Sequence, residues 1–208
     1  VRVSFYRSGL LLKLAAGRLS LAPWQPRPKA DGDAAFPDLT FLHLLFGHRT
    51  LDELKGKWVV LGWTNLGCPF VKKHYDPGAM QALQKAWAEK GVVWLTVCSS
   101  APGKQGHMDA EGWKKAIAQQ KIASTAVLLD ADGTMGRAYG ARKTPHMWVV
   151  CPKGTIWYTG AIDDNPSNAP DAKATRNYVS DALEAGLAGK EPAVTETQPY
   201  GCSVKYAN

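Results

Sequence analysis

Cys68 is the residue best placed to do chemistry, because the sequence around it predicts a strand, a short turn and the start of a helix. Residues 58–63 form a short run of β-branched and aromatic side chains, which is typical of a buried strand. Pro69 suits the first position of a helix, since its ring fixes φ and it has no N–H to leave unpaired. Cys68 would therefore stand where unpaired backbone N–H groups favour an anion.

A thiolate is such an anion. In this setting the pKa of a cysteine can fall from about 8.5 into the range of roughly 3.5–7.5, so a nucleophilic fraction exists at neutral pH. Lys72 and Lys73 add positive charge one turn further along the helix. The alternative interpretation is that Cys68 is a small apolar residue of the core, the usual role of a free cysteine. The combination of strand, turn, Cys-Pro and helix is more restrictive than a lone cysteine and favours the reactive role.

The segment Trp63-x-x-x-x-Cys68-Pro69 after a hydrophobic strand resembles the active-site segment of the thioredoxin-fold redoxins. This group contains the thioredoxin-like proteins and the peroxiredoxins of the alkyl hydroperoxide reductase/thiol-specific antioxidant family. The resemblance covers residues from about 36 to 188. It implies a thiol-dependent oxidoreductase, either a peroxiredoxin-like peroxidase or a thiol-disulfide oxidoreductase, with Cys68 as the nucleophile.

Two positions depart from the patterns of these families. Thioredoxins carry a second cysteine three residues after the first, where this chain has Val71, so the local resolving thiol is missing. Peroxiredoxins carry Thr or Ser three residues before the reactive cysteine, where this chain has Asn65. The hydroxyl that would orient a peroxide is therefore absent, and we expect Asn65 to line the substrate site in its place.

Thr144-Pro145 directly precedes a predicted strand and resembles the cis-proline loop of thioredoxin-fold proteins, which faces the active cysteine. An X–Pro bond is cis in only about 5–6% of cases in general. The resemblance nevertheless implies a cis bond beside Cys68, with the Thr144 backbone able to pair with an extended substrate. Thr144, Pro145 and Asn65 are thus the predicted substrate-binding residues.

Cys202, near the end of the chain, is the predicted resolving thiol. An oxidised Cys68 without a local partner must be resolved by a small thiol, by another chain or by a distant cysteine of its own. The roughly 14 residues between Gly189 and Cys202 span at most about 46 Å when extended, which is enough to cross a domain of this size. We predict a Cys68–Cys202 disulfide, within one chain or between two. Three apolar or aromatic residues near Cys202 favour a docked tail, Tyr200, Val204 and Tyr206.

The two other cysteines leave alternatives open. None of the four has CxxC spacing, which excludes a zinc ribbon and a thioredoxin dithiol. Cys98 ends an apolar predicted strand and is expected in the core. Cys202 could instead form a permanent bridge with Cys98 or Cys151, or stay free.

The other elements follow from hydrophobic patterning and turn residues. Hydrophobic patterning predicts strands at 92–98 and 127–130 and hairpins at 39–51 and 146–158. Asp76-Pro77 is expected to start a helix with Asp76 as its N-cap. A further helix carries Trp113, Ile117 and Ile122, and the last is expected to begin at Asp171. The order predicts an α/β thioredoxin-like three-layer sandwich, with a central mixed sheet, helices on both faces, an N-terminal hairpin and a C-terminal tail.

Length and charge indicate one domain without a nucleic-acid partner. The 208 residues are 45% hydrophobic and 21% charged, as in an ordinary globular protein. The domain is placed at residues 36–188 and a docking tail at 189–208. Six basic residues and no acid occur in the first thirty residues, which leaves 19 basic and 18 acidic residues elsewhere. A near-neutral body predicts no basic groove.

Residues 1–35 are read as a segment outside the domain. A basic start, an apolar stretch at 9–16 and small residues at 20–22 suggest an export signal, which would make the protein exported or periplasmic. The alternative is a flexible basic arm on a cytoplasmic protein. No stretch approaches the 18 apolar residues of a membrane span, so stable membrane insertion is not expected.

The leading hypothesis needs no cofactor or metal: a peroxide or protein disulfide is the substrate, and an unidentified thiol is the reductant. A second hypothesis is a copper-binding protein on the same fold with Cys68, His74 and His146 as ligands, because thiolate and imidazole suit copper. A third is a non-catalytic binding module whose cysteines are structural.

Overall fold

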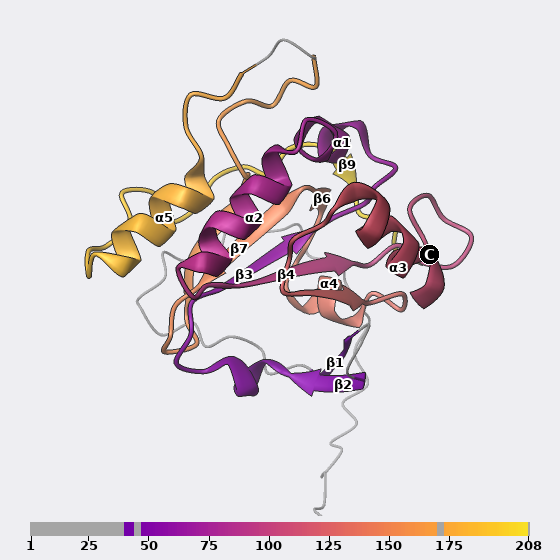
Figure 1. Ribbon diagram of the computed structural model, residues 1–208, viewed down its shortest axis with the longest axis horizontal. Helices are drawn as coiled ribbons and strands as arrows, with labels where there is room; N and C mark the ends of the chain where they lie inside the picture. Colours follow the sequence, from indigo (N-terminus) through magenta and orange to yellow (C-terminus); the bar gives the residue numbers. More distant parts are fainter. Residues whose placement is uncertain (1–39, 44–46, 170–172, 208) are drawn as a thin grey trace, which may run out of the picture. The chain divides into compact units, whose positions relative to one another are not determined.

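The computed structural model describes residues 40–43, 47–169 and 173–207, with side chains from Glu53 onward (Figure 1). All of them belong to one compact unit, Gly32–Asn208. The predicted signal-like segment, residues 1–35, lies outside the described residues. None of the helices within the described ranges combines the length and the apolar character needed to cross a membrane.

A seven-stranded mixed sheet forms the centre of the domain, in the order β2-β1-β5-β4-β3-β7-β8. The three strands β3, β4 and β5 are parallel, because helical connections return the chain to the same end of the sheet before each new strand. The pairs β3–β7, β7–β8, β1–β2 and β1–β5 are antiparallel. The strands are β1 Thr40–His43, β2 Gly47–Thr50, β3 Val59–Trp63, β4 Val93–Cys98, β5 Ala126–Leu129, β7 His146–Val150 and β8 Ile156–Gly160.

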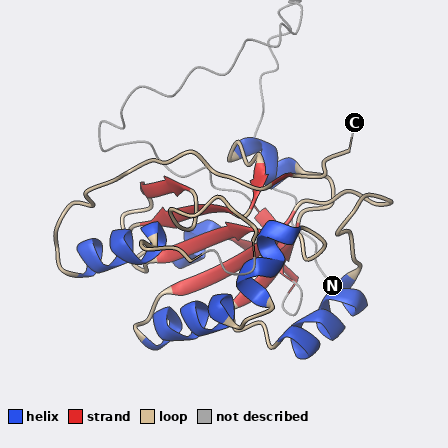
Figure 2. Ribbon diagram, turned by 90° about the horizontal axis from the view of Figure 1, so that it is seen from above, coloured by secondary structure: helices blue, strands red, loops and turns tan. Residues whose placement is uncertain are grey.

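Helices cover both faces of this sheet, as Figure 2 shows. On one face, α1, α2, α3 and α5 bury apolar side chains such as Trp87 and Trp113 against Trp94 of β4. On the other, α4 and a short 3-10 helix pack Met135 and Leu54 against that side of the sheet. The helices are the 3-10 helix Leu51–Leu54, α1 Pro69–Tyr75, α2 Ala79–Glu89, α3 Ala110–Gln120, α4 Thr134–Ala138 and α5 Tyr178–Leu187. The predicted α/β sandwich of thioredoxin type is confirmed.

Two predicted helix starts are wrong. Asp76 ends α1 and caps no new helix, because its N–H bonds to the Lys72 carbonyl; α2 follows a left-handed Gly78, with φ 81°. The last helix begins at Tyr178, since the Asn177 side chain accepts a hydrogen bond from the Ser180 N–H and so caps it. The predicted start, Asp171, lies outside the described residues.

Helix α4 has no counterpart in the sequence prediction, since five residues are too short to show a helical period. The buried Asp130 carboxylate fixes its first turn by accepting hydrogen bonds from the N–H groups of Met135 and Gly136, at 2.9 and 2.8 Å.

The end of the chain lies along the domain and adds a second, two-stranded sheet. β6 (Lys143–Thr144) pairs antiparallel with β9 (Cys202–Ser203), so that Thr144 stands opposite Cys202. Upstream, the N–H of Thr197 bonds to the carbonyl of Thr159 on the edge strand β8. Strands of two residues carry no alternating pattern, so neither β6 nor β9 could be predicted. The domain boundaries proposed from the sequence stay predictions.

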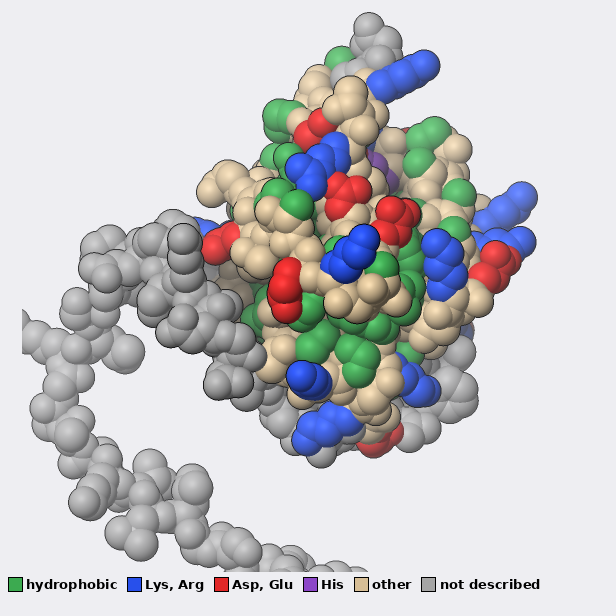
Figure 3. All heavy atoms as spheres, turned by 90° about the vertical axis from the view of Figure 1, so that its left-hand side faces the viewer, with side chains coloured by type: hydrophobic (Ala, Val, Ile, Leu, Met, Phe, Trp, Pro, Cys, Tyr) green, Lys and Arg blue, Asp and Glu red, His purple; other side chains and the backbone are tan. Residues whose placement is uncertain are grey.

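Charged side chains of both signs are interspersed on the face shown in Figure 3. No continuous basic field appears among the described residues of this face, in keeping with the nearly equal numbers of acids and bases after residue 30.

Candidate active site

Cys68 is held at the N-terminus of α1 by local geometry. Its extended backbone, with φ −83° and ψ 127°, makes it the N-cap residue, and Pro69 occupies the first helical position. The Cys68 carbonyl accepts from the N–H groups of Val71 and Lys72, at 3.0 and 2.9 Å. The Cys68 side chain is completely buried, at 0% exposure. A reactant can therefore reach its sulfur only if something above it moves.

The group above it is Cys202. The two sulfur atoms lie 2.6 Å apart, although 134 residues separate them in the chain. Both cysteines are free thiols, and Cys202 is partly exposed. The Thr144 carbonyl oxygen lies 3.2 Å from the Cys68 sulfur on another side. The start of α1, the Thr144 loop and the tail thus meet at one point, where the labels α1, β6 and β9 lie together in Figure 1.

The two thiols have opposite electrostatic settings. Burial raises the pKa of Cys68, but hydrogen bonds from the Cys202 and Thr144 side chains and from the backbone of Cys202 and Val71 outweigh it, and the pKa lies below its ordinary value of 9.0. Burial and the neighbouring Cys68 sulfur raise the pKa of Cys202 to about 11. The pKa of Cys68 therefore lies below that of Cys202, and Cys68 is the thiol of the pair that ionises first.

The bond between Thr144 and Pro145 is cis. The prediction placed this loop beside Cys68, and the contact of the Thr144 carbonyl with the Cys68 sulfur puts it there. The Thr144 backbone, expected to pair with an extended substrate, is instead paired with Cys202 of the chain's own tail. A substrate that pairs with Thr144 must therefore displace β9.

Asn65 is 1% exposed, and its side chain joins two loops. Its Nδ2 donates to the Gln105 carbonyl at 3.0 Å, and its Oδ1 accepts from the Gly67 N–H at 2.9 Å. Its carbonyl oxygen also accepts from the Cys68 N–H at 2.9 Å. These contacts make Asn65 a residue that shapes the turn before Cys68. Direct contact with substrate stays a prediction.

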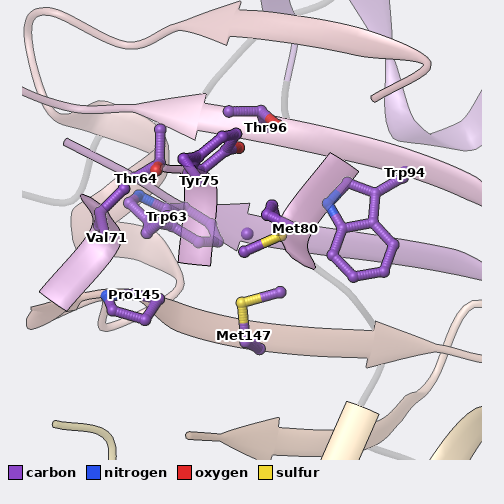
Figure 4. A pocket seen from close by; sticks show the side chains of 10 residues that line it. Trp63, Thr64, Val71, Tyr75, Met80, Trp94, Thr96, Pro145 and Met147 are labelled. Atoms are coloured by element: carbon purple, nitrogen blue, oxygen red, sulfur yellow. The ribbon is translucent and has the colours of Figure 1, made fainter. Parts of the chain in front are cut away.

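A small cavity lies behind the site, between α1, α2 and the strands β3, β4 and β7 (Figure 4). Val71 and Pro145 stand on one side of it and Trp94 on the other, with Tyr75, Met80 and Met147 between them. Its volume is about 10 Å³, which at most holds one water molecule. It cannot admit a peroxide or a peptide, so a substrate must approach from the side covered by the tail.

The other two cysteines are placed for structural roles. Cys98 is buried, its sulfur lies 3.6 Å from the Gly106 carbonyl oxygen, and burial raises the pKa of its thiol. Cys151 is also buried, with its sulfur 2.9 Å from the Thr155 hydroxyl. Neither is bridged to Cys202.

The copper hypothesis finds no support in the arrangement of its proposed ligands. His74 Nε2 lies 3.1 Å from the Tyr200 hydroxyl, and the His146 ring packs against Trp148 at a tilt of 41°, with ring centroids 3.9 Å apart. Among the residues with described side chains, no group of three or more His, Cys, Asp or Glu is able to hold a metal ion.

This sheet with helices on both faces, and a Cys-Pro helix start facing a cis-proline loop, is the architecture of the thioredoxin-fold redoxins. The sequence model of the AhpC/TSA family matches residues 33–159, more than half of the chain. The chain therefore belongs to this family, and thiol-based redox chemistry is its function in general terms. A search of curated proteins finds no match.

Solved structures show the same fold. An uncharacterized conserved protein from Geobacillus kaustophilus is 22% identical with a TM-score of 0.73, and the match covers 85% of this chain and 92% of that one. A hypothetical protein from Sinorhizobium meliloti is 21% identical with a TM-score of 0.72, covering 83% and 93%. A secreted disulfide oxidoreductase from Mycobacterium tuberculosis is 19% identical with a TM-score of 0.51, covering 71% and 96%.

Sequence reasoning missed Asp163 and gave His74 a different role. Both contact Tyr200 of the tail in the structure. Asp163 follows a strand in an irregular segment and carries no motif, so no signal in one sequence could have found it.

Proposed function

We propose that this protein is a thiol-dependent oxidoreductase whose two redox cysteines, Cys68 and Cys202, are far apart in the sequence and adjacent in the fold. The single observation that carries the proposal is the 2.6 Å separation of their sulfur atoms. Val71 stands where a thioredoxin would carry its second cysteine. In this chain the tail, 134 residues further on, places the Cys202 thiol beside the Cys68 sulfur instead. The opposite shifts of the two pKa values, lowered in Cys68 and raised in Cys202, support Cys68 as the nucleophile and Cys202 as the resolving group.

With a disulfide substrate, the Cys68 thiolate attacks one sulfur, forms a mixed disulfide and releases the other sulfur as a thiolate. The Cys202 thiol then loses its proton and attacks the Cys68 sulfur. This step forms the Cys68–Cys202 disulfide and expels the second half of the substrate as a thiolate, which takes up a proton. Two electrons have passed from the protein to the substrate, and an external thiol must return them.

With a peroxide substrate, the Cys68 thiolate attacks one peroxide oxygen and becomes a sulfenic acid as the O–O bond breaks. The other oxygen leaves as an alkoxide or hydroxide and takes up a proton, which gives an alcohol or water. Cys202 then condenses with the sulfenic acid, which releases water and forms the same disulfide. Both routes end in one oxidised state of the protein. The substrate classes are distinguished by which oxidant produces that state faster.

Thr144 and Pro145 are proposed to receive the substrate beside Cys68. The Thr144 carbonyl oxygen already lies 3.2 Å from the Cys68 sulfur, and Thr144 is buried. Asn65 is proposed to support this site by holding the turn before Cys68.

Non-reducing peptide mapping after one equivalent of oxidant tests the proposal. The expected product links the Cys68 peptide to the Cys202 peptide, with either hydrogen peroxide or a small disulfide as oxidant. A Cys68 peptide found only as sulfinic acid, or linked to another cysteine, would contradict it. The Cys202→Ser variant should stop at a mixed disulfide on Cys68.

An export signal in residues 1–35 would place this chemistry outside the cytoplasm, where disulfides persist. We propose export on the basis of that segment, and the secreted oxidoreductase of the same fold from Mycobacterium tuberculosis accords with it. Fractionation of cells expressing the full chain, with residues 1–35 present or deleted, tests this location.

A further inference from the structure

Tyr200, two residues before Cys202, is bound to a buried carboxylate. Its hydroxyl donates to Asp163 Oδ1 at 2.5 Å, and His74 Nε2 lies 3.1 Å from the same hydroxyl. Asp163 and His74 are 6% and 8% exposed, so the three polar groups satisfy one another away from solvent. A hydrogen bond to a buried, charged acceptor is among the stronger ones in a protein.

His74 is uncharged in this cluster near neutral pH. Burial lowers its pKa to about 4, partly opposed by the charge of Asp163. The 4.0 Å approach of His74 Nε2 to Asp163 Oδ2 is therefore no strong ion pair. The Asp163 carboxylate accepts hydrogen bonds from two neutral donors, the Tyr200 hydroxyl and the Asn165 N–H at 3.1 Å, and the Lys73 ammonium adds an electrostatic attraction. Loss of the Tyr200 hydroxyl leaves a buried charge short of a partner.

The aromatic ring of Tyr200 also packs on α1, the helix that begins beside Cys68. Its centroid lies 6.1 Å from that of Phe70, and the Lys73 ammonium lies 4.7 Å from the ring centroid. Tyr200 thus binds the tail to the element that carries Cys68. The segment between the two anchors is short, since only Gly201 separates Tyr200 from Cys202.

Contacts after Cys202 hold the tail to other parts of the domain. The Val204 N–H bonds to the Arg142 carbonyl at 3.1 Å, and the Tyr206 hydroxyl donates to the Ala141 carbonyl at 2.8 Å. These contacts fix the tail to the loop before β6 and not to α1. The position of Cys202 relative to the Cys68 sulfur is therefore set on one side by Tyr200 and on the other by this loop.

We propose that Tyr200, through Asp163 and His74, is a positioning residue for the resolving step, which holds Cys202 on the Cys68 sulfur once Cys68 has been oxidised. This inference rests on the proposed function of the two cysteines. In the resolving step the Cys202 sulfur attacks Cys68 and the group bound to Cys68 leaves. Tyr200 exchanges no electrons or protons with them, and its contribution is to keep the attacking sulfur within reach.

The Tyr200→Phe variant tests this role, because phenylalanine keeps the ring against Phe70 and removes only the hydroxyl. The reduced protein is mixed with one equivalent of hydrogen peroxide or a small disulfide and quenched by alkylation at successive times. Mass spectrometry then follows oxidation of Cys68 and formation of the Cys68–Cys202 disulfide separately. We expect the rate of disulfide formation to fall about tenfold or more, as for the loss of one hydrogen bond to a charged group. The rate of Cys68 oxidation should stay equal or rise.

Tyr178→Phe is the matched control. Tyr178 follows Asn177, which bridges to Asp163, but its ring packs on Tyr158 and Arg176. This variant should form the disulfide at the wild-type rate.

The variants at Asp163 give a second measure: Asp163→Ala should slow resolution as Tyr200→Phe does, whereas Asp163→Asn, which keeps an acceptor oxygen, should restore part of the rate. Combining Asp163→Ala with Tyr200→Phe should add little further effect.

The possible failures are distinguishable. Wild-type protein that never links Cys68 to Cys202 would overturn the proposed function itself. Wild-type protein that forms the link, together with a Tyr200→Phe variant that forms it equally fast, would overturn the role of Tyr200 alone. Equal slowing of Cys68 oxidation and of resolution would show a general structural effect and would likewise overturn it.

Discussion

Gly201 lies directly against the carbonyl oxygen of Thr144: a Cβ atom at Gly201 would stand 2.3 Å from that oxygen. Gly201 also has a φ of +104°, which residues with side chains rarely adopt. Its missing side chain lets β9 approach β6 closely enough to place Cys202 opposite Thr144 and above Cys68. Glycine at this position is therefore a condition for bringing the two thiols together.

The Gly201→Ala variant should consequently form the Cys68–Cys202 disulfide at least about tenfold more slowly than wild type. Gly189→Ala is the matched control, because Gly189 also has a positive φ, +69°, but nothing lies within 4 Å of its would-be Cβ. Both variants carry a backbone penalty of roughly 1–2 kcal/mol, and only Gly201→Ala adds a collision. Time-resolved peptide mapping measures the rates, and equal rates in the two variants would refute the role of the close approach.

Replacing the proposed nucleophile should abolish catalysis. Cys68→Ser is expected to lower thiol-dependent peroxidase or disulfide-reductase activity to the uncatalysed rate, because a serine hydroxyl is not ionised at neutral pH. Cys98→Ser and Cys151→Ser should keep at least part of the activity, since both residues are buried and their sulfur atoms contact Gly106 and Thr155 rather than the paired thiols. Turnover is measured with each oxidant and excess thiol. Full activity in Cys68→Ser would disprove the assignment.

Removing the resolving thiol should raise the pKa of Cys68. Burial by itself pushes that pKa up, and the Cys202 side chain is the first of the hydrogen-bond donors that bring it down. In Cys202→Val, which keeps an apolar side chain over the Cys68 sulfur and removes only the donor, the thiolate fraction at neutral pH should therefore decrease. The pH dependence of Cys68 alkylation measures this, with each rate normalised to its high-pH plateau. An unchanged or lower pKa in the variant would contradict the proposed donor role.

The stability of the fold should decrease in mild acid. Burial lowers the pKa of His74 from its ordinary 6.5 to about 4, so the unfolded chain binds a proton more readily than the folded one. The stabilisation from neutral His74 is complete above pH 6.5 and is lost as the pH falls towards 4, by up to roughly 3 kcal/mol.

Denaturant unfolding at a series of pH values measures this effect, with the His74→Gln variant for comparison. Glutamine does not titrate, so the variant should lose less stability than wild type between pH 6.5 and 4. His146, whose pKa burial lowers to about 3, contributes acid sensitivity that both proteins share. Identical slopes in wild type and variant would show that His74 is not the titrating group.

The local part of the site could be predicted from the sequence. Strand 59–63, the turn and the Cys-Pro helix start are short-range features, because strand periodicity and the fixed φ of Pro69 act within a few residues. The loop at Thr144-Pro145 was recognisable through its resemblance to the redoxins. The fold followed from the order of these elements. The two wrong helix starts lie where a short cap decided the outcome, at Asp76 and Asn177.

The tertiary structure decided which thiol faces Cys68. The composition of the tail indicated that it docks, but its path depends on contacts that carry no periodicity: the pairing of two-residue strands, the close approach of Gly201 to Thr144, and the bond from Tyr200 to Asp163. Each joins residues tens of positions apart, and each exists only once the sheet and α1 are in place. A sequence pattern reports the preferences of neighbours along the chain, whereas the meeting of Cys68 and Cys202 is a property of packed surfaces that only the folded domain provides.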